Sequence, residues 1–124
     1  MHDQPSVQEL VAAVKSFIDD TAAPQLSGHA AFHARVASNA LATVLRDLEQ
    51  RPKAEAQERQ GLLDLLKSSA DQSTAELNRT LSERIRDGQM TPSTPGLLQH
   101  LKQTVMAQVE IDQPRYSGLK TAKS

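Results

Sequence analysis

The sequence predicts an all-α fold, a single up-down bundle of about five helices. Apolar residues recur three and four positions apart in successive segments, which is the spacing of one face of an α-helix. The runs of β-branched and aromatic residues that mark strands are missing, and aromatic residues make up only 2% of the chain. Short connections between amphipathic helices favour antiparallel neighbours, so we expect the helices to pack as a bundle.

The first helix is predicted to begin at Ser6, since Ser6 and Glu9 form a capping box in which each side chain bonds the other residue's amide. It should end near residues 21–23, because Pro24 disfavours a helical conformation in the residue before it. A longer second helix is expected over residues 27–50, where many alanines allow neighbouring helices to approach closely.

Pro52 is expected to mark a turn before a third helix over residues 53–68. The first half of this helix is polar and should be exposed, whereas its second half carries four leucines. Gly61 weakens the middle of the helix by roughly 1 kcal/mol relative to alanine, which predicts a kink or a late start there.

Two further helices complete the predicted bundle. The fourth begins with a capping box formed by Ser73 and Glu76. It ends at Gly88, because glycine adopts the left-handed conformation of a helix C-cap without steric cost. The fifth is expected to start with Thr94 as its N-cap and Pro95 as its first helical residue.

The length of 124 residues suits one domain, which we place at residues 1–116, followed by a flexible basic tail at residues 117–124. The 14 Lys and Arg residues against 15 Asp and Glu residues give a net charge of −1, so we expect no nucleic-acid partner. The lack of cysteine excludes disulfides and thiolate chemistry. Neither a secretory signal nor a membrane-spanning stretch is recognisable, so we expect a cytoplasmic protein that contacts no membrane.

The most unusual segment is residues 29–39, where His29 and His33 lie four residues apart on one helix face. Two imidazoles at this spacing can share a metal ion, but no third ligand is evident nearby, so we expect neither a metal site nor another cofactor. His33 is otherwise expected to donate a hydrogen bond inside the bundle. Arg35, Asn39 and Arg46 lie on the same helix and either pair with neighbouring groups as scaffold or form a patch that binds an anion or a partner's acidic group.

Arg84 lies among alternating charges, which favour a solvated face with weak ion pairs. In the alternative interpretation, Arg84 lines a cleft together with the polar residues of segment 29–39. Arg115 and Tyr116 follow a proline turn after the fifth helix. There the tyrosine ring either anchors the chain end on the bundle or belongs to a docking motif for another protein.

Three segments together resemble a family of short, all-helical bacterial domains of unknown function: residues 1–6 (MHDQPS), 32–41 (FHARVASNAL) and 111–116 (IDQPRY). Gln113 stands where the family pattern has asparagine. The resemblance spans residues 1–116. It implies a domain that is encoded beside, or fused behind, aminoglycoside-phosphotransferase-like kinases, often near acyl-CoA dehydrogenases. It carries no catalytic residues over to this sequence.

The absence of a recognised catalytic motif, together with this resemblance, predicts a non-enzymatic accessory domain that binds a phosphotransferase-like kinase or an acyl-CoA dehydrogenase. The expected contact residues are His33, Arg35, Asn39, Arg115 and Tyr116. The alternative is a domain that binds a small molecule or anion between the second and fourth helices, at a site that the first three of these residues line with Arg84. The aliphatic core also predicts either moderate stability or burial of one face in a homodimer or a partner.

Overall fold

The computed structural model describes residues 5–123, and every regular element in this range is helical. The predicted all-α class is therefore confirmed. Residues 1–4, which carry most of the opening motif, and residue 124, at the end of the expected tail, lie outside the described residues. The helices divide between two compact units, Met1–Arg51 and Pro52–Ser124.

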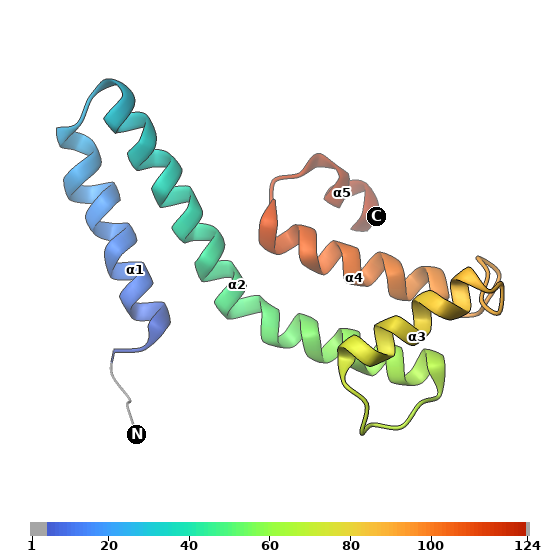
Figure 1. Ribbon diagram of the computed structural model, residues 1–124. Helices are drawn as coiled ribbons and strands as arrows, with labels where there is room; N and C mark the ends of the chain where they lie inside the picture. The colour runs from blue at the N-terminus through green and yellow to red at the C-terminus, as the bar shows by residue number, and fades with distance from the viewer. Residues whose placement is uncertain (1–4, 124) are drawn as a thin grey trace. The chain divides into compact units, whose positions relative to one another are not determined.

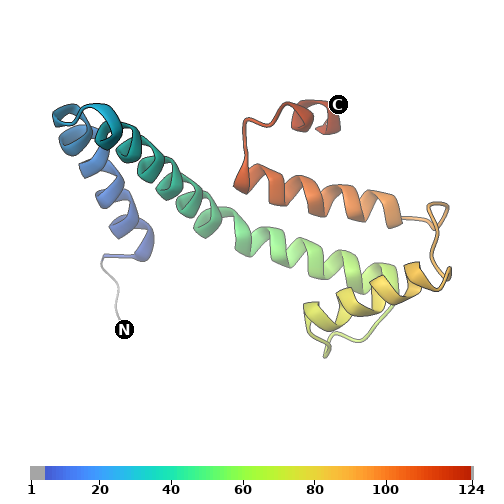
Figure 2. The same ribbon diagram turned by 45° about the horizontal axis from the view of Figure 1, so that its top comes forward.

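The first unit is a helical hairpin, in which α1 (Val7–Phe17) lies beside the first part of α2 (Gly28–Leu66), as Figures 1 and 2 show. The predicted capping box at the start of α1 is confirmed. The Ser6 hydroxyl accepts a hydrogen bond from the Glu9 amide at 3.1 Å, and the Glu9 carboxylate accepts one from the Ser6 amide at 3.4 Å. The hairpin thus begins where the sequence places it.

The helical path of α1 continues beyond the predicted end at residues 21–23. It passes through a π-helical turn, η1 (Ile18–Ala22), and a 3₁₀ turn, η2 (Ala23–Gln25). Pro24 lies in the first turn of η2, where a residue's own amide has no helical partner and a proline is therefore tolerated. The chain becomes extended only at Leu26.

The predicted turn at Pro52 is wrong, because α2 is one helix of 39 residues with Pro52 inside it. A proline within a helix removes one backbone hydrogen bond and costs about 3 kcal/mol. The boundary between the two units falls at Pro52. Despite the length of α2, no helix within residues 5–123 has both the span and the apolar character needed to cross a membrane.

The C-terminal end of α2 is closed by an unusual left-handed residue, Lys67, with a φ of 53°. The amide of Ser68 donates to the carbonyl of Leu63 at 3.4 Å, which is the long-range bond of a Schellman motif. Glycine is the usual residue at the left-handed position of this motif, because it has no Cβ. Lys67 therefore holds a conformation that its side chain disfavours.

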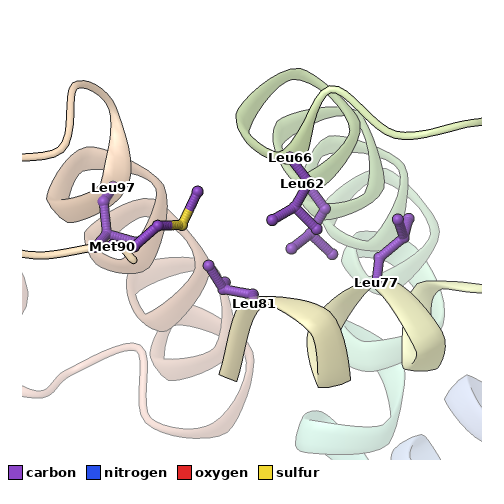
Figure 3. Close-up of a cluster of buried hydrophobic side chains, with 6 residues drawn as sticks. All are labelled: Leu62, Leu66, Leu77, Leu81, Met90 and Leu97. Atoms are coloured by element: carbon purple, nitrogen blue, oxygen red, sulfur yellow. The ribbon is translucent and has the colours of Figure 1, made fainter. Parts of the chain in front are cut away.

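The second unit contains the hydrophobic core, built from the end of α2, α3 (Thr74–Arg86), the following loop and α4 (Leu97–Asp112). Figure 3 shows its six buried members: Leu62, Leu66, Leu77, Leu81, Met90 and Leu97. Arg59 was expected to lie on an exposed stretch, yet it is half-buried and donates to the carbonyl of Ala70 at 2.6 Å. This bond ties the α2–α3 loop to α2.

The predictions for the ends of α3 are confirmed. Ser73 and Glu76 form the capping box, with both bonds at 3.1 Å, and Gly88 has a φ of 79° just beyond the helix. The predicted start of α4 is wrong, because the helix begins at Leu97 with Gly96 as its N-cap. Gly96 has a φ of 85°, which is incompatible with a helix running through it from Pro95.

Helix α5 (Ser117–Lys123) occupies most of the segment that was expected to be a flexible tail. Its single large apolar residue, Leu119, is buried. The Lys123 ammonium lies 2.7 Å from the Glu110 carboxylate, which links α5 to α4. One buried leucine and one ion pair are too few to produce an apolar period, which explains why the sequence pattern does not predict this helix.

Candidate partner-binding surface on helix α2

The outer face of α2, which we define as His29, Phe32, His33 and Val36, is exposed near the start of the helix. Ser38 is buried on the side of α2 that contacts α1. At 100° per residue, the four residues lie roughly 120–180° around the helix from Ser38, so they point away from the hairpin partner. Phe32 is 52% exposed and Val36 is 49% exposed, so two large apolar side chains lie beside the histidines on this face.

The aromatic rings of the outer face contact one another. The rings of Phe32 and His33 meet edge to face, with centroids 5.6 Å apart. The rings of His29 and His33 are stacked with centroids 6.5 Å apart and an interplanar angle of 28°. Phe32 and His33 thus pack against each other at the surface of α2.

Among the residues that the structure describes, His29 and His33 do not belong to a larger ligand cluster. Across residues 5–123, no group of three or more His, Cys, Asp or Glu side chains is placed to hold a metal ion. Two imidazoles alone fall short of the three or four protein ligands that zinc sites use.

Arg35 and Asn39 lie beside the outer face and are both exposed. The structure gives the Asn39 backbone carbonyl a hydrogen bond from Thr43 at 3.3 Å, but it assigns neither side chain a hydrogen bond or an ion pair within residues 5–123. Both side chains are therefore exposed to solvent in the part of the chain that the structure describes.

Arg84 lies in the other unit, on α3, where it is half-buried. Its guanidinium Nη1 donates to the carbonyl of Leu66 at 3.5 Å. Leu66 is the last residue of α2, so Arg84 satisfies a carbonyl that has no partner within the helix. The structure thus gives Arg84 a capping contact, while His33, Arg35 and Asn39 belong to the first unit.

Arg115 and Tyr116 lie in the exposed turn between α4 and α5. The Tyr116 amide donates to the Gln113 carbonyl at 2.9 Å, which closes the predicted chain reversal. The ring lies over Gly118, so closely that a Cβ at position 118 would overlap it. Tyr116 remains 56% exposed, so the ring covers the start of α5 and still presents its other side to solvent.

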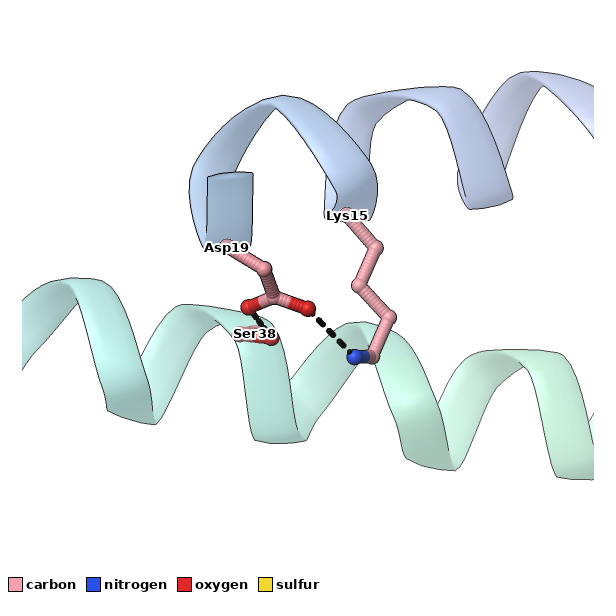
Figure 4. Close-up of polar contacts among 3 residues, drawn as sticks. All are labelled: Lys15, Asp19 and Ser38. Carbon is pink, nitrogen blue, oxygen red and sulfur yellow. Dashed lines mark hydrogen bonds and ion pairs between the residues drawn. The ribbon is translucent and has the colours of Figure 1, made fainter. Parts of the chain in front are cut away.

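A polar contact that the sequence interpretation missed joins α1 and η1 to α2 (Figure 4). The Ser38 hydroxyl donates to Asp19 at 2.5 Å, and the Lys15 ammonium lies 2.7 Å from the same carboxylate. These hydrogen bonds, that of Lys15 first, lower the pKa of Asp19 below its ordinary value. The only sequence signal was a serine within a row of alanines, which does not by itself indicate a partner 19 residues away.

Comparison with known proteins yields one match. The model of a family described as a domain of unknown function (DUF6285) matches residues 24–116. This range contains the whole outer face of α2, the core of the second unit and the turn at Tyr116. No curated protein matches the chain, and no solved structure matches it either.

Proposed function

The chain belongs to the DUF6285 family, and from this premise we propose that it is a non-enzymatic accessory domain that binds a partner enzyme. The partner is a phosphotransferase-like kinase or an acyl-CoA dehydrogenase, the enzymes that the sequence resemblance implies. A bacterial, cytoplasmic setting belongs to the same proposal, because such kinases use ATP and such dehydrogenases use acyl-CoA, and both substrates are found in the cytoplasm.

The observation that carries this proposal is the exposure of Phe32 and Val36 on the outer face of α2. Aromatic side chains are enriched among the residues that dominate interface affinity, and they act by filling a pocket on the partner. An exposed phenylalanine already held against His33 is a suitable anchor of this kind. The partner is therefore expected to offer an apolar pocket for Phe32.

The polar rim of the outer face supplies orientation. Arg35 and Asn39 are exposed beside Phe32, and Arg35 has a guanidinium that can bind a carboxylate with two parallel hydrogen bonds. Interfaces commonly surround an apolar anchor with polar contacts that exclude water and fix the register. A partner surface with an acidic residue next to the apolar pocket fits this arrangement.

The test measures binding of the purified chain to an aminoglycoside-phosphotransferase-like kinase, the partner class that the resemblance implies, by isothermal titration calorimetry. Phe32→Ala should weaken the complex about 30-fold, which corresponds to the 2 kcal/mol typical of an interface anchor. Leu98→Ala is the control, because Leu98 is 56% exposed on α4 and lies outside the outer face. It should leave the affinity unchanged.

Three results would contradict the proposal. The first is no complex with the kinase-like enzyme or the acyl-CoA dehydrogenase at micromolar concentrations. The second is an equal loss of affinity for Phe32→Ala and Leu98→Ala. The third is substrate turnover by the purified chain alone that is lost on Arg35→Ala, because this would assign catalysis to the chain itself.

A further inference from the structure

Helix α1 carries an apolar line that its hairpin neighbour leaves uncovered. The line follows a spacing of three, four and three residues, which is the a and d pattern of a bundle helix. Its members are the most exposed large apolar residues of the helix: Val7 (62%), Leu10 (53%), Val14 (52%) and Phe17 (59%). The neighbouring Val11 and Ile18 are half-buried, so they mark the side that faces α2.

Helix α2 carries a matching line with a spacing of four, three and four residues. It consists of Ala37, Leu41, Val44 and Leu48. Ser38 and Leu45 lie one position beyond two members of this line, and Ser38 bonds Asp19 at the end of α1. The residues that contact α1 are therefore offset from the line itself, as they are on α1.

The two lines lie on the same flank of the hairpin. At 100° per residue, each line is rotated by roughly 70–80° from the residues that face the other helix, in the same sense about each helix's own axis. Because the helices are antiparallel, the same sense of rotation leads to the same flank. We call this flank the seam face and define it by the eight residues of the two lines.

The seam face has the composition of half a four-helix bundle. Helices in such bundles bury about three positions in seven. In the hairpin alone, the four seam residues of α1 and Ala37 and Val44 of α2 stay exposed, whereas Leu41 and Leu48 are half-buried. The five most exposed members of the seam face, Val7, Leu10, Val14, Phe17 and Val44, are 42–62% exposed and present on the order of 450 Å² in one hairpin, which is near the largest patch of a typical monomer. Two such patches contribute about 900 Å², and the three remaining seam residues and the rim of each face add to this toward the roughly 1,200 Å² of a stable interface.

The shape of the seam face matches a second copy of itself. Phe17 forms its largest projection and Ala37 its smallest side chain. The Ser38–Asp19 bond sets the register of the hairpin, so Phe17 and Ala37 lie within about one helical turn of each other in height. A two-fold axis through the face places Phe17 of each copy near Ala37 of the other copy, as an isologous interface requires.

We propose that the seam face binds the seam face of a second copy of this chain, so that two hairpins form a four-helix bundle. This interface is separate from the outer face of α2. The chain would then present two outer faces to partner enzymes, one from each copy. The inference does not depend on the proposed function, because it concerns different residues and a different partner.

The full-length chain offers a closely matched pair of variants for the test. Val14 and Val36 are the same residue type with almost equal exposure, 52% and 49%, but only Val14 belongs to the seam face. Sedimentation velocity at micromolar concentrations should show a dimer for the native chain and for Val36→Glu. Val14→Glu should weaken dimerisation about 100-fold or more, because the two-fold axis buries the unpaired charge twice.

Circular dichroism of each variant separates loss of folding from loss of association. If Val14→Glu loses helicity, Leu10→Gln is used instead, since it keeps a good helix former and removes only the apolar contact. A monomeric native chain would overturn the proposal, and so would a dimer that survives both seam variants or is lost equally in Val36→Glu. A monomer destabilised only by Val14→Glu would show that another part of the same chain covers the face.

Discussion

Replacing Gly61 with alanine should destabilise the protein, although alanine is the better helix former. Gly61 lies inside α2, and a Cβ added there would be 2.5 Å from Nδ1 and 2.9 Å from Cε1 of the His100 ring. Ordinary contacts between such atoms begin near 3.4 Å. Because His100 is buried on α4, its ring has little room to move away. Gly61 is thus required for close approach of the two helices, and α2 continues through it.

The size of the effect follows from two opposing contributions. Alanine in place of glycine in a helix interior gains about 1 kcal/mol. Overpacking of a buried contact costs about 1–3 kcal/mol. We therefore expect Gly61→Ala to lower the free energy of unfolding by about 1 kcal/mol. In a His100→Ala background the clash is gone, so the same substitution should raise the free energy of unfolding by about 1 kcal/mol.

The assay is urea unfolding followed by circular dichroism, applied to the native chain, the two single variants and the double variant. The change of sign between the two backgrounds is the decisive result, because helix propensity alone cannot produce it. If Gly61→Ala stabilises the native chain, or destabilises both backgrounds equally, the contact between Gly61 and His100 does not have the role described.

Two further predictions concern the end of α2 and the polar contact of the hairpin. Lys67→Gly should raise the free energy of unfolding by about 1 kcal/mol, because the left-handed conformation at this position costs a residue with a Cβ that much. Lys67→Ala keeps the Cβ and should leave the free energy of unfolding unchanged. Equal urea midpoints for the two variants would argue against strain at this position. Hydrogen bonds from Lys15 and Ser38 hold the folded-state pKa of Asp19 below its ordinary value of 3.8, so the unfolded chain takes up the proton first as the pH falls. The stabilisation from Asp19 is therefore fully present above 3.8 and is lost as the pH falls through the lower folded-state value. The free energy of unfolding, measured as the pH is lowered, should show this loss in the native chain and in Asp20→Asn but not in Asp19→Asn. The same pH dependence in all three proteins would refute the role of the contact.

Local signals were sufficient for most helix ends. Ser6, Ser73 and Gly88 act within one turn of their own positions, so the sequence around them determines the cap. Pro52 and Thr94 were misinterpreted, because α2 continues through Pro52 and the left-handed Gly96 delays the start of α4.

In the candidate surface, too, the sequence identified individual residues but not the contacts that orient them. The sequence identified His33, Arg35 and Asn39 as unusual, but a helical period alone does not say which side of α2 contacts α1. The buried Ser38 and its bond to Asp19 settle that orientation, and this pair is far apart in sequence. The contact of Arg84 with Leu66 was likewise not predictable, because it depends on how α3 packs beside the end of α2.

The confinement of the buried leucine cluster to the second unit has a consequence for the lifetime of the protein in a cell. No large apolar side chain of the described hairpin residues is fully enclosed, so the hairpin opens at a lower free energy than the leucine-rich unit. Proteases cut chains in such opened states. Limited proteolysis of the purified chain should therefore cut the hairpin before the leucine-rich unit.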